Sequence, residues 1–433
     1  QYAGQSAADK IVLLRDELKR NNSDCLIVSA LDEIAWLLNI RGNDIPFNPV
    51  AIAYLIISQE SITLFIDKHK LSVAVEQYLL HNGVAVLPYE SIFAGIAQLP
   101  AHSRVLIDDG RLNQALADNI PAGAVIRRMP SPIQLMKSKK NETELSGVER
   151  AMIQDAIALT HFFYWLEEWR DNPARERLTE YDIMQRLHSF RAEREHFVEE
   201  SFETIAGYKG NGAIVHYEAT ATDCAEVLPE GILLLDSGGQ YLDGTTDITR
   251  TVALSAPTEQ QKHDYTLVLK GHIALANAIF PKGTRGNQLD CLAHQYLWQE
   301  GLNYTHGTGH GVGHFLCCHE GPQNIRTDNN PSPLHIGNIC SDEPGLYRAN
   351  QYGIRIENLI TVVPACTTEF GEYYKFKTLT LCFYDTTLID TSLLTAKELK
   401  WLNEYHHRVA ETVCPLLPIK QAEWLKNKCK PIE

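Results

Sequence analysis

From Asn141 onward the sequence passes twice through the same order of elements, helical segments followed by strands and turns rich in Gly, Asp and His. In the first pass a helix is predicted from Asn141 towards Trp169, because Asn141 and Glu144 have the spacing of a capping box. A second helical pattern begins at Thr179, and strands and turns dominate from Glu200. This order predicts two α+β halves packed side by side.

The second pass begins with another capped helix. Thr258 and Gln261 have capping-box spacing, and the helical pattern that they open runs to about Phe280. A further helix is predicted over residues 287–300, and a second strand block follows it. Beyond residue 380 one more helical stretch, residues 396–413, precedes a Lys-rich end.

The first 135 residues have a different organisation, in which helical and strand patterns alternate. Ile11, Leu14 and Leu18 form a helical stripe, and residues 25–28 are typical of a buried strand. Further strands are predicted at 51–57, 62–66, 84–87 and 105–107, and a helix at 71–80. Such alternation predicts an α/β layer domain that serves as a scaffold or a lid. We therefore predict three parts: an α/β domain over residues 1–135, a catalytic domain over 136–380 and a C-terminal extension over 381–433.

Charge and composition exclude several classes of function. The net charge of −15 argues against a nucleic-acid partner, because phosphate binding needs concentrated Lys and Arg. No apolar run approaches the roughly 20 residues that span a bilayer, and the first residues carry no secretion-signal pattern, so we expect no membrane attachment. The ten cysteines include no C-x-x-C pair. Reduced thiols in a cytoplasmic protein are the expectation.

The first group of residues able to do chemistry is a pair of aspartates around a turn. An apolar strand ends in Asp236, glycines follow, and Asp247 opens the return strand. A hairpin of this kind brings two carboxylates together across adjacent strands. The alternative is that both are turn aspartates that accept only from local backbone N–H groups.

The second group is a glycine-interleaved run of histidines, His306, His310 and His314, with His319 five residues later. Glycine at every other position removes side chains and lets the backbone approach a ligand or a metal closely. A single histidine is most often a satisfied core residue, but four within fourteen residues favour a ligand site over that alternative.

The third group contains two glutamates, Glu343 in a turn and Glu357 in an apolar stretch that reads as a strand. A buried carboxylate without a partner costs several kcal/mol or becomes protonated, so Glu357 needs a partner. Arg355, two residues earlier, is the structural candidate for that partner, and a metal is the functional one.

Four carboxylates and one imidazole together match a pair of divalent ions, whose charge offsets the repulsion among the carboxylates. Metal binding lowers the pKa of water from 15.7 to about 7, so a bridging hydroxide becomes available near neutral pH. Oxygen ligands with a single nitrogen favour Mn²⁺ over a thiolate-type zinc site, while Zn²⁺ and Co²⁺ remain alternatives. The sequence therefore predicts a two-metal hydrolase.

These residues resemble the pita-bread metallopeptidase family and, within it, the Xaa-Pro aminopeptidases. The resemblance covers nearly the whole chain. Its matching stretches lie in order: 212–217 (GAIVHY), 235–251 (LDSGGQYLDGTTDITRT), 306–313 (HGTGHGVG), 319–322 (HEGP), 341–345 (SDEPG) and 353–358 (GIRIEN). The front, including residues 30–36, resembles the second domain of the long cytosolic form, of creatinase-N type, and the end resembles that form's C-terminal extension. The first domain of the long form, which contributes to substrate enclosure in the family, has no match here.

The resemblance implies a metal-ligand set of Asp236, Asp247, His310, Glu343 and Glu357. Asp247 and Glu357 would bridge two ions, and Glu343 would also accept a proton from the attacking water. His216, His306 and His319 would line the substrate site and orient or protonate the tetrahedral intermediate. Arg355 and Tyr347 resemble residues that support the metals or bind substrate. The family removes an N-terminal residue when proline follows it, and a homodimer is a family expectation.

Three alternatives stay open at this point. A prolidase-like dipeptidase shares the fold and would prefer X-Pro to X-Pro-Y. A non-catalytic pita-bread module would bind peptides, and creatinase is a metal-free enzyme on this fold. Cys317 and Cys318, beside the histidine run, are either packing residues or a redox- or metal-sensitive site.

Overall fold

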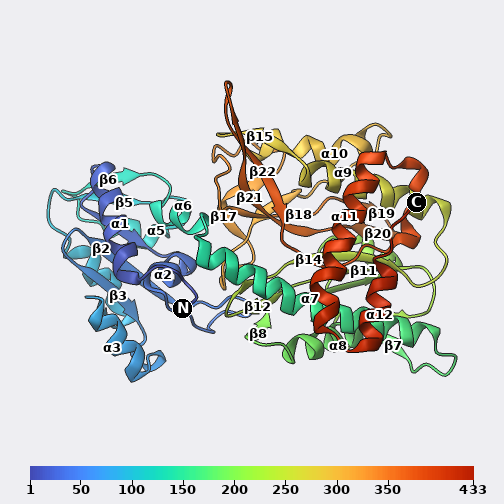
Figure 1. The fold of residues 1–433 in the computed structure, drawn as a ribbon. Coiled ribbons are helices and arrows are strands. Elements are labelled where there is room, and N and C mark those ends of the chain that lie inside the picture. The colour runs from blue at the N-terminus through green and yellow to red at the C-terminus, as the bar shows by residue number, and fades with distance from the viewer. The chain divides into compact units, whose positions relative to one another are not determined.

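The computed structural model describes residues 1–433, and the chain divides into two compact units, Gln1–Lys137 and Ser138–Glu433 (Figure 1). The first unit is the α/β layer domain that the alternating pattern predicts. The second contains helices, short strands and a long hairpin. No helix in the chain combines the length and the apolar character that crossing a bilayer requires.

The first unit is built on a mixed six-stranded sheet with the order β4-β3-β2-β1-β5-β6. β1 pairs antiparallel with β2 and parallel with β5, so the most buried strand lies at the centre of the sheet. All four β1 residues are buried, as expected for a strand covered on both faces. The strands are β1 (Cys25–Val28), β2 (Ala53–Ser58), β3 (Ile62–Ile66), β4 (Ala85–Leu87), β5 (Arg104–Ile107) and β6 (Val125–Arg128).

Helices connect these strands. The stripe of Ile11, Leu14 and Leu18 is buried on the first helix, and Ser6 caps that helix by accepting from the Asp9 N–H. The helices of this unit are α1 (Ala7–Arg20), α2 (Leu31–Leu38), α3 (Val73–His81), α4 (Ile92–Ala97), α5 (Gln114–Asp118) and α6 (Pro132–Ser138). Each strand and helix predicted in this region is present, with ends displaced by up to two residues.

Glu33 on α2 makes the stability of the first unit depend on pH. Its side chain is 1% exposed and accepts from the Ser131 hydroxyl at 2.5 Å. Burial raises the pKa of Glu33 from 4.5 to about 7, with a contribution from the charge of Asp32. The folded unit therefore holds this proton more tightly than the unfolded chain. The contribution of Glu33 to the free energy of unfolding is greatest below about pH 4.5 and falls as the pH rises to about 7.

We expect Glu33→Gln to remove this pH dependence and to raise the stability of the first unit at pH 8 by up to about 3 kcal/mol. Hydrogen exchange of the β1 amides, measured by mass spectrometry at pH 5.5 and pH 8, reports this unit alone. Glu90→Gln, at an exposed glutamate, serves as the control. Equal pH dependence of β1 protection in Glu33→Gln and the wild-type chain would contradict the prediction.

The second unit carries six helices. Capping boxes open α7 at Asn141, α8 at Thr179 and α9 at Thr258, which confirms the two that the sequence predicts. The helices are α7 (Glu142–Asp171), α8 (Glu180–Ala192), α9 (Glu259–Ala276), α10 (Asp290–Trp298), α11 (Ala396–Val413) and α12 (Ile419–Lys428).

The strands of the second unit form several small sheets and one larger sheet. One three-stranded sheet has the order β14-β11-β9 and another the order β13-β12-β8. A six-stranded sheet runs β15-β22-β21-β18-β16-β17, and β19 pairs with β20. The strands are β7 (Leu178–Thr179), β8 (Phe197–Glu200), β9 (Ile205–Tyr208), β10 (Glu226–Val227), β11 (Ile232–Ser237), β12 (Gly239–Tyr241), β13 (Gly244–Thr245), β14 (Ile248–Ala253), β15 (Ile279–Pro281), β16 (Gly309–Gly311), β17 (Glu320–Ile325), β18 (Ile339–Asp342), β19 (Gly345–Arg348), β20 (Tyr352–Arg355), β21 (Asn358–Thr368) and β22 (Gly371–Thr378).

One prediction about the helices of this unit is wrong, and one helix was not predicted. The helix that begins after Thr258 ends at Ala276 rather than near Phe280, because Asn277 terminates it and Phe280 lies in β15. A short apolar run reads equally well as helix or strand, and here pairing with β22 decides. The Lys-rich end, for which the sequence analysis predicts no element, forms α12, which begins after Pro418.

None of the ten cysteines forms a disulfide, as expected from their spacing. Cys318 is buried and Cys317 is partly exposed.

Candidate metal centre

Two adjacent antiparallel strands position the aspartates. Asp236 lies near the end of β11, opposite Thr249 on β14, and Asp247 immediately precedes β14. Both carboxylates are buried, with exposed fractions of 8% and 3%. The strand pair therefore brings the two side chains to the same end of the sheet. The segment that connects β11 to β14 contains β12 and β13.

Neither aspartate serves merely to satisfy a local turn. Asp236 Oδ2 accepts from Arg355, at 2.6 Å from Nη2 and 3.1 Å from Nε, and its Oδ1 is buried without a hydrogen-bond partner. Asp247 Oδ2 lies 3.3 Å from Nε2 of His310 and accepts from the Cys318 thiol at 3.2 Å. These partners are 63 or more residues away in the chain, so the local-turn alternative does not hold.

His310 is the middle residue of the three-residue strand β16. Its Nδ1 donates to the Gly311 carbonyl at 3.0 Å, which directs Nε2 towards Asp247 and towards Glu343 Oε1, 3.5 Å away. The flanking glycines were predicted to admit a ligand or metal to the backbone. Gly307 and Gly309 line a cavity together with His310, and Gly309 also admits a neighbouring strand, because a Cβ on it would lie 2.0 Å from the Ser341 carbonyl oxygen.

Glu343 directly follows β18 and is oriented by its neighbours. Its N–H donates to the Thr308 carbonyl at 2.8 Å, and its Oε1 accepts from the Ser341 hydroxyl at 3.1 Å. Ser341 also accepts from the His310 N–H at 2.9 Å. One hydroxyl thus sets the relative position of the imidazole and the carboxylate.

Glu357 lies in the connection between β20 and β21, and not within a strand as the apolar pattern predicts. Its burial is as expected, with 1% exposed. Oε2 accepts from the Thr249 hydroxyl at 2.8 Å, while Oε1 is buried without a partner. Arg355, the structural candidate for its partner, directs its guanidinium to Asp236 instead, which removes that alternative.

These side chains line one cavity of about 410 Å³. It collects every residue that the sequence analysis assigned to metal, catalysis or substrate except Tyr347. His314, the remaining histidine of the four, is buried and does not line this cavity. The lining residues are Phe202, Ile205, Val215, His216, Asp236, Asp247, His306, Gly307, Gly309, His310, His319, Arg326, Glu343, Arg355 and Glu357.

The cavity has the charge of a cation site. Burial and the charges of neighbouring carboxylates raise the pKa of Glu357 well above its usual range, and burial raises the pKa of Glu343 to about 7. Burial likewise raises the pKa of Asp236, although Arg355 opposes that shift. A divalent cation bound beside these carboxylates would favour their ionised forms and so offset the rise in their pKa values.

The donor set fits metal ions on geometry as well. Ligand atoms of Asp247, His310 and Glu357 all lie within 4.8 Å of one another, so one ion could contact all three. The two buried oxygens without partners, on Asp236 and Glu357, belong to the same cavity. Buried polar atoms are nearly always paired, and a bound cation would pair both of these.

A chain of hydrogen bonds connects the centre to the rim of the cavity. The Arg355 Nη1 donates to the Tyr347 hydroxyl at 2.7 Å, and that hydroxyl lies 2.8 Å from Nε2 of His306. His306 Nδ1 must donate to the Gly307 carbonyl, 2.8 Å away, so its Nε2 accepts from Tyr347. Burial lowers the pKa of His306 to about 4, which keeps this ring neutral at physiological pH.

His216 and His319 line the cavity from exposed positions. The His319 ring lies 4.2 Å from the ring of His310. Neither side chain has a hydrogen-bond partner within the chain, so both rings are available to a bound molecule. His306 also lines the cavity, but both of its ring nitrogens already have hydrogen-bond partners, the Gly307 carbonyl and the Tyr347 hydroxyl.

Several contributors were not found by sequence reasoning. Thr249 bonds the carboxylate of Glu357, and Arg326 and Phe202 line the cavity. Cys318 contacts Asp247, which goes beyond simple packing. A threonine or an arginine carries no local signal of this kind, because its partner lies far along the chain.

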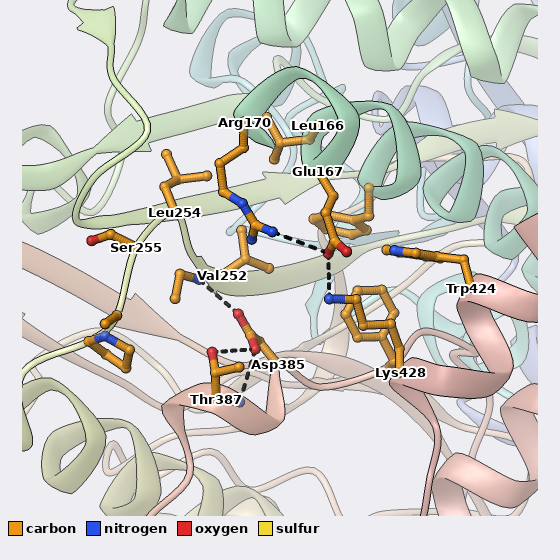
Figure 2. A pocket seen from close by; sticks show the side chains of 15 residues that line it. Leu166, Glu167, Arg170, Val252, Leu254, Ser255, Asp385, Thr387, Trp424 and Lys428 are labelled. Carbon is orange, nitrogen blue, oxygen red and sulfur yellow. Dashed lines mark hydrogen bonds and ion pairs between the residues drawn. The ribbon is translucent and has the colours of Figure 1, made fainter. Parts of the chain in front are cut away.

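A second cavity of about 260 Å³ shares no lining residue with the first. Figure 2 shows it between α7, the end of β14 and α12. Its charged groups are satisfied internally: Glu167 pairs with Lys428 and lies 4.0 Å from Arg170, and Asp385 accepts from the Ala253 N–H.

Comparison with known proteins agrees with this geometry. Residues 146–364 match metallopeptidase family M24, residues 1–144 match a creatinase/prolidase N-terminal domain, and residues 372–432 match the C-terminal region of peptidase M24. Xaa-Pro aminopeptidase 1 of Dictyostelium discoideum is 41% identical over the whole chain, which covers 70% of that protein. Aminopeptidase P2 of Arabidopsis thaliana is 42% identical, with 65% of its length covered.

Solved structures give the same result. An X-prolyl aminopeptidase from Caenorhabditis elegans, described as a cytosolic enzyme with a di-nuclear active site, superposes with a TM-score of 0.94 at 36% identity, covering all of this chain and 72% of that one. An Xaa-Pro dipeptidase from Bacillus anthracis has a TM-score of 0.68 at 20% identity over 87% of this chain, which shows a shared fold only. The predicted fold, a creatinase-N-like domain followed by a pita-bread domain with a C-terminal region, is confirmed, and the chain belongs to metallopeptidase family M24, among relatives named Xaa-Pro aminopeptidase.

Proposed function

We propose that the chain is a metal-dependent aminopeptidase that hydrolyses the bond between an N-terminal residue and a following proline. The observation that carries the proposal is the cavity in which four carboxylates and His310 converge, with two buried carboxylate oxygens left without partners. The M24 match and relatives named Xaa-Pro aminopeptidase support the substrate class.

Asp236, Asp247, His310, Glu343 and Glu357 would hold two divalent ions, and the family resemblance implies that Asp247 and Glu357 would be shared between them. When bound, the ions would supply an acidified water and polarise the scissile carbonyl. Mn²⁺ is the ion we propose, because four of the five donors are carboxylates; Zn²⁺ and Co²⁺ are the alternatives. Metal analysis of the protein purified without added cations tests the identity.

The chain's own groups then carry out the proton transfers. Glu343 would accept a proton from the attacking water; in support, it lines the cavity and its Oε1 lies 3.5 Å from Nε2 of His310. The proline nitrogen is a tertiary amide that has no N–H, so it must gain a proton to leave as an amine. Glu343 or solvent supplies that proton.

Residues at the rim of the cavity would recognise the substrate. His216 and His319, whose ring nitrogens have no partner in the chain, would bond the peptide and stabilise the developing oxyanion. Arg355, through Tyr347, keeps the neutral His306 in a fixed orientation, so that this group of three shapes the site without changing charge.

The dipeptidase alternative differs in substrate length. We expect kcat/KM for a tripeptide X-Pro-Y to exceed that for X-Pro by at least about tenfold, which corresponds to about 1.4 kcal/mol of transition-state binding. Hydrolysis of both peptides is measured with Mn²⁺ present, and X-Ala-Y serves as the control for proline preference. A preference for X-Pro would support the dipeptidase, and no cleavage with metal bound would support a peptide-binding module.

Two further proposals rest on family likeness. A cytoplasmic location is supported by the description of the Caenorhabditis elegans relative as cytosolic, together with ten cysteines in this chain that form no disulfide. A homodimer is supported by the family resemblance alone. Light scattering during size-exclusion chromatography, which distinguishes one chain from two, tests the latter.

A further inference from the structure

Arg250 on β14 is a buried cation without a carboxylate partner. Its side chain is 2% exposed, and no Asp or Glu lies within ion-pair distance of it. Its guanidinium instead donates to six oxygens, four of them main-chain carbonyls. Burying a charge in this manner is unfavourable unless every donor is satisfied. The arrangement therefore holds this guanidinium in one orientation.

One side of the Arg250 guanidinium faces the residues that place Glu357. Nη1 donates to the Glu357 carbonyl at 2.6 Å and to the Thr249 carbonyl at 2.9 Å, and Nη2 donates to the Asn358 side chain at 2.8 Å. Thr249 in turn donates its hydroxyl to the Glu357 carboxylate. The same guanidinium thus fixes the main chain of both Glu357 and the residue that orients its side chain.

The other side faces the C-terminal region. Nε donates to the Phe383 carbonyl at 2.9 Å, and Nη2 donates to the Cys382 carbonyl at 2.8 Å and to the Tyr405 hydroxyl at 3.1 Å. Tyr405, on α11, also accepts from the Cys382 N–H at 3.2 Å. The face of the Tyr384 ring lies 4.5 Å from the guanidinium carbon, which adds a cation–π contact.

The C-terminal region is itself anchored to β14 and α7. The Asp385 carboxylate accepts from the Ala253 N–H at 2.8 Å, three residues after Arg250, as Figure 2 shows. Phe383 packs edge-on against Trp424 of α12, with ring centroids 5.4 Å apart. Lys428 of α12 pairs with Glu167 of α7. The oxygens that receive the guanidinium are therefore held by contacts outside the metal cavity.

We propose that Arg250 is a positioning residue for the metal centre, held in place by Tyr405 and the 382–383 carbonyls of the C-terminal region. Arg250 contacts neither the proposed ions nor the substrate; it acts through Thr249 and Glu357. The inference rests on the proposed function, because it assigns the C-terminal region a role in placing a proposed metal ligand. Contacts that orient a ligand typically change metal affinity by 10- to 100-fold.

The test uses Tyr405→Phe, which removes only the hydroxyl, with Tyr208→Phe as the matched control. Tyr208 is also a buried tyrosine whose hydroxyl donates to a carbonyl, that of Glu230 at 3.0 Å, but it has no contact with Arg250. Each metal-free protein is titrated with Mn²⁺ in competition with a fluorescent chelator, and its urea midpoint is measured in parallel. We expect similar midpoints for the two variants, with Mn²⁺ affinity weakened about tenfold in Tyr405→Phe alone.

Arg250→Lys, alone and combined with Tyr405→Phe, tests whether Tyr405 acts on the metal centre through Arg250. Lysine keeps the charge but has one nitrogen, so we expect a loss of Mn²⁺ affinity at least as large as in Tyr405→Phe. If Tyr405 acts through Arg250, adding Tyr405→Phe to Arg250→Lys produces no further loss. Wild-type affinity in Tyr405→Phe, or fully additive losses in the double variant, would overturn the positioning role. A wild-type chain that takes up no divalent cation would instead refute the proposed function.

Discussion

Replacing Glu343 with glutamine will lower kcat for an X-Pro-Y peptide by roughly a thousandfold while the protein stays folded. General acid–base catalysis contributes roughly 10²- to 10⁴-fold, and an amide cannot accept the proton of the attacking water. Glutamine keeps the volume of the side chain and can still accept from the Ser341 hydroxyl. The loss is measured by steady-state hydrolysis at saturating Mn²⁺, with circular dichroism to verify the fold.

Glu343 is also proposed to bind metal, so the metal content of the variant must be measured together with its rate. Full occupancy with a lost kcat identifies the proton-accepting role, whereas partial occupancy identifies the ligand role. Glu149→Gln is the control, because Glu149 is a carboxylate on the surface that pairs only with Lys377. Wild-type turnover in Glu343→Gln would refute the assignment of this residue.

An element of the fold can be predicted from the sequence when the residues that determine it are close together in the chain. The capping boxes at Asn141 and Thr258 involve residues three apart, and both are found where expected. The boundary near Phe280 is wrong because its apolar run fits two periodicities, and β22, almost a hundred residues away, determines the outcome. The helix α12 was missed because a Lys-rich composition does not by itself indicate an amphipathic face.

For the candidate site as well, some features could be predicted from the sequence, whereas others depend on contacts between distant residues. The convergence of Asp236, Asp247 and Glu357 follows from the argument that several buried carboxylates need a shared cation, which requires no knowledge of the fold. The partner of Arg355 could not be predicted in this way, since it is fixed by the packing of β20 beside β11. The role of Arg250 could not be predicted from the sequence, although the residue lies in a stretch that matches the family, because most of the carbonyls that it bonds are more than 100 residues away.

The second large effect is that of Glu357→Gln on the melting temperature. Relative to the wild-type chain, we expect the substitution to raise the melting temperature without metal and to lower it with metal bound. In the metal-free protein, burial and neighbouring carboxylates raise the pKa of Glu357 well above its usual range, so its charge destabilises the folded state. We therefore expect Glu357→Gln to raise the melting temperature of the chelator-treated protein. In the wild-type chain, Mn²⁺ at a hundred times its Kd adds about 2.7 kcal/mol to the stability, which raises the melting temperature by roughly 4 °C. The variant should lose most of that gain.

Asp243→Asn is the matched control for this sign change. Asp243 is also a buried carboxylate, with 5% exposed, but Arg150 donates to it at 2.6 Å and 3.0 Å from two nitrogens. Its amide variant loses an ion pair, so it should melt below the wild-type protein whether metal is present or absent. Differential scanning calorimetry of the three proteins, with chelator and with Mn²⁺, separates the two behaviours. If metal-free Glu357→Gln instead melts below the metal-free wild-type protein, as expected for Asp243→Asn, then Glu357 has a favourable partner within the metal-free protein. The charge argument for two divalent ions would then fail.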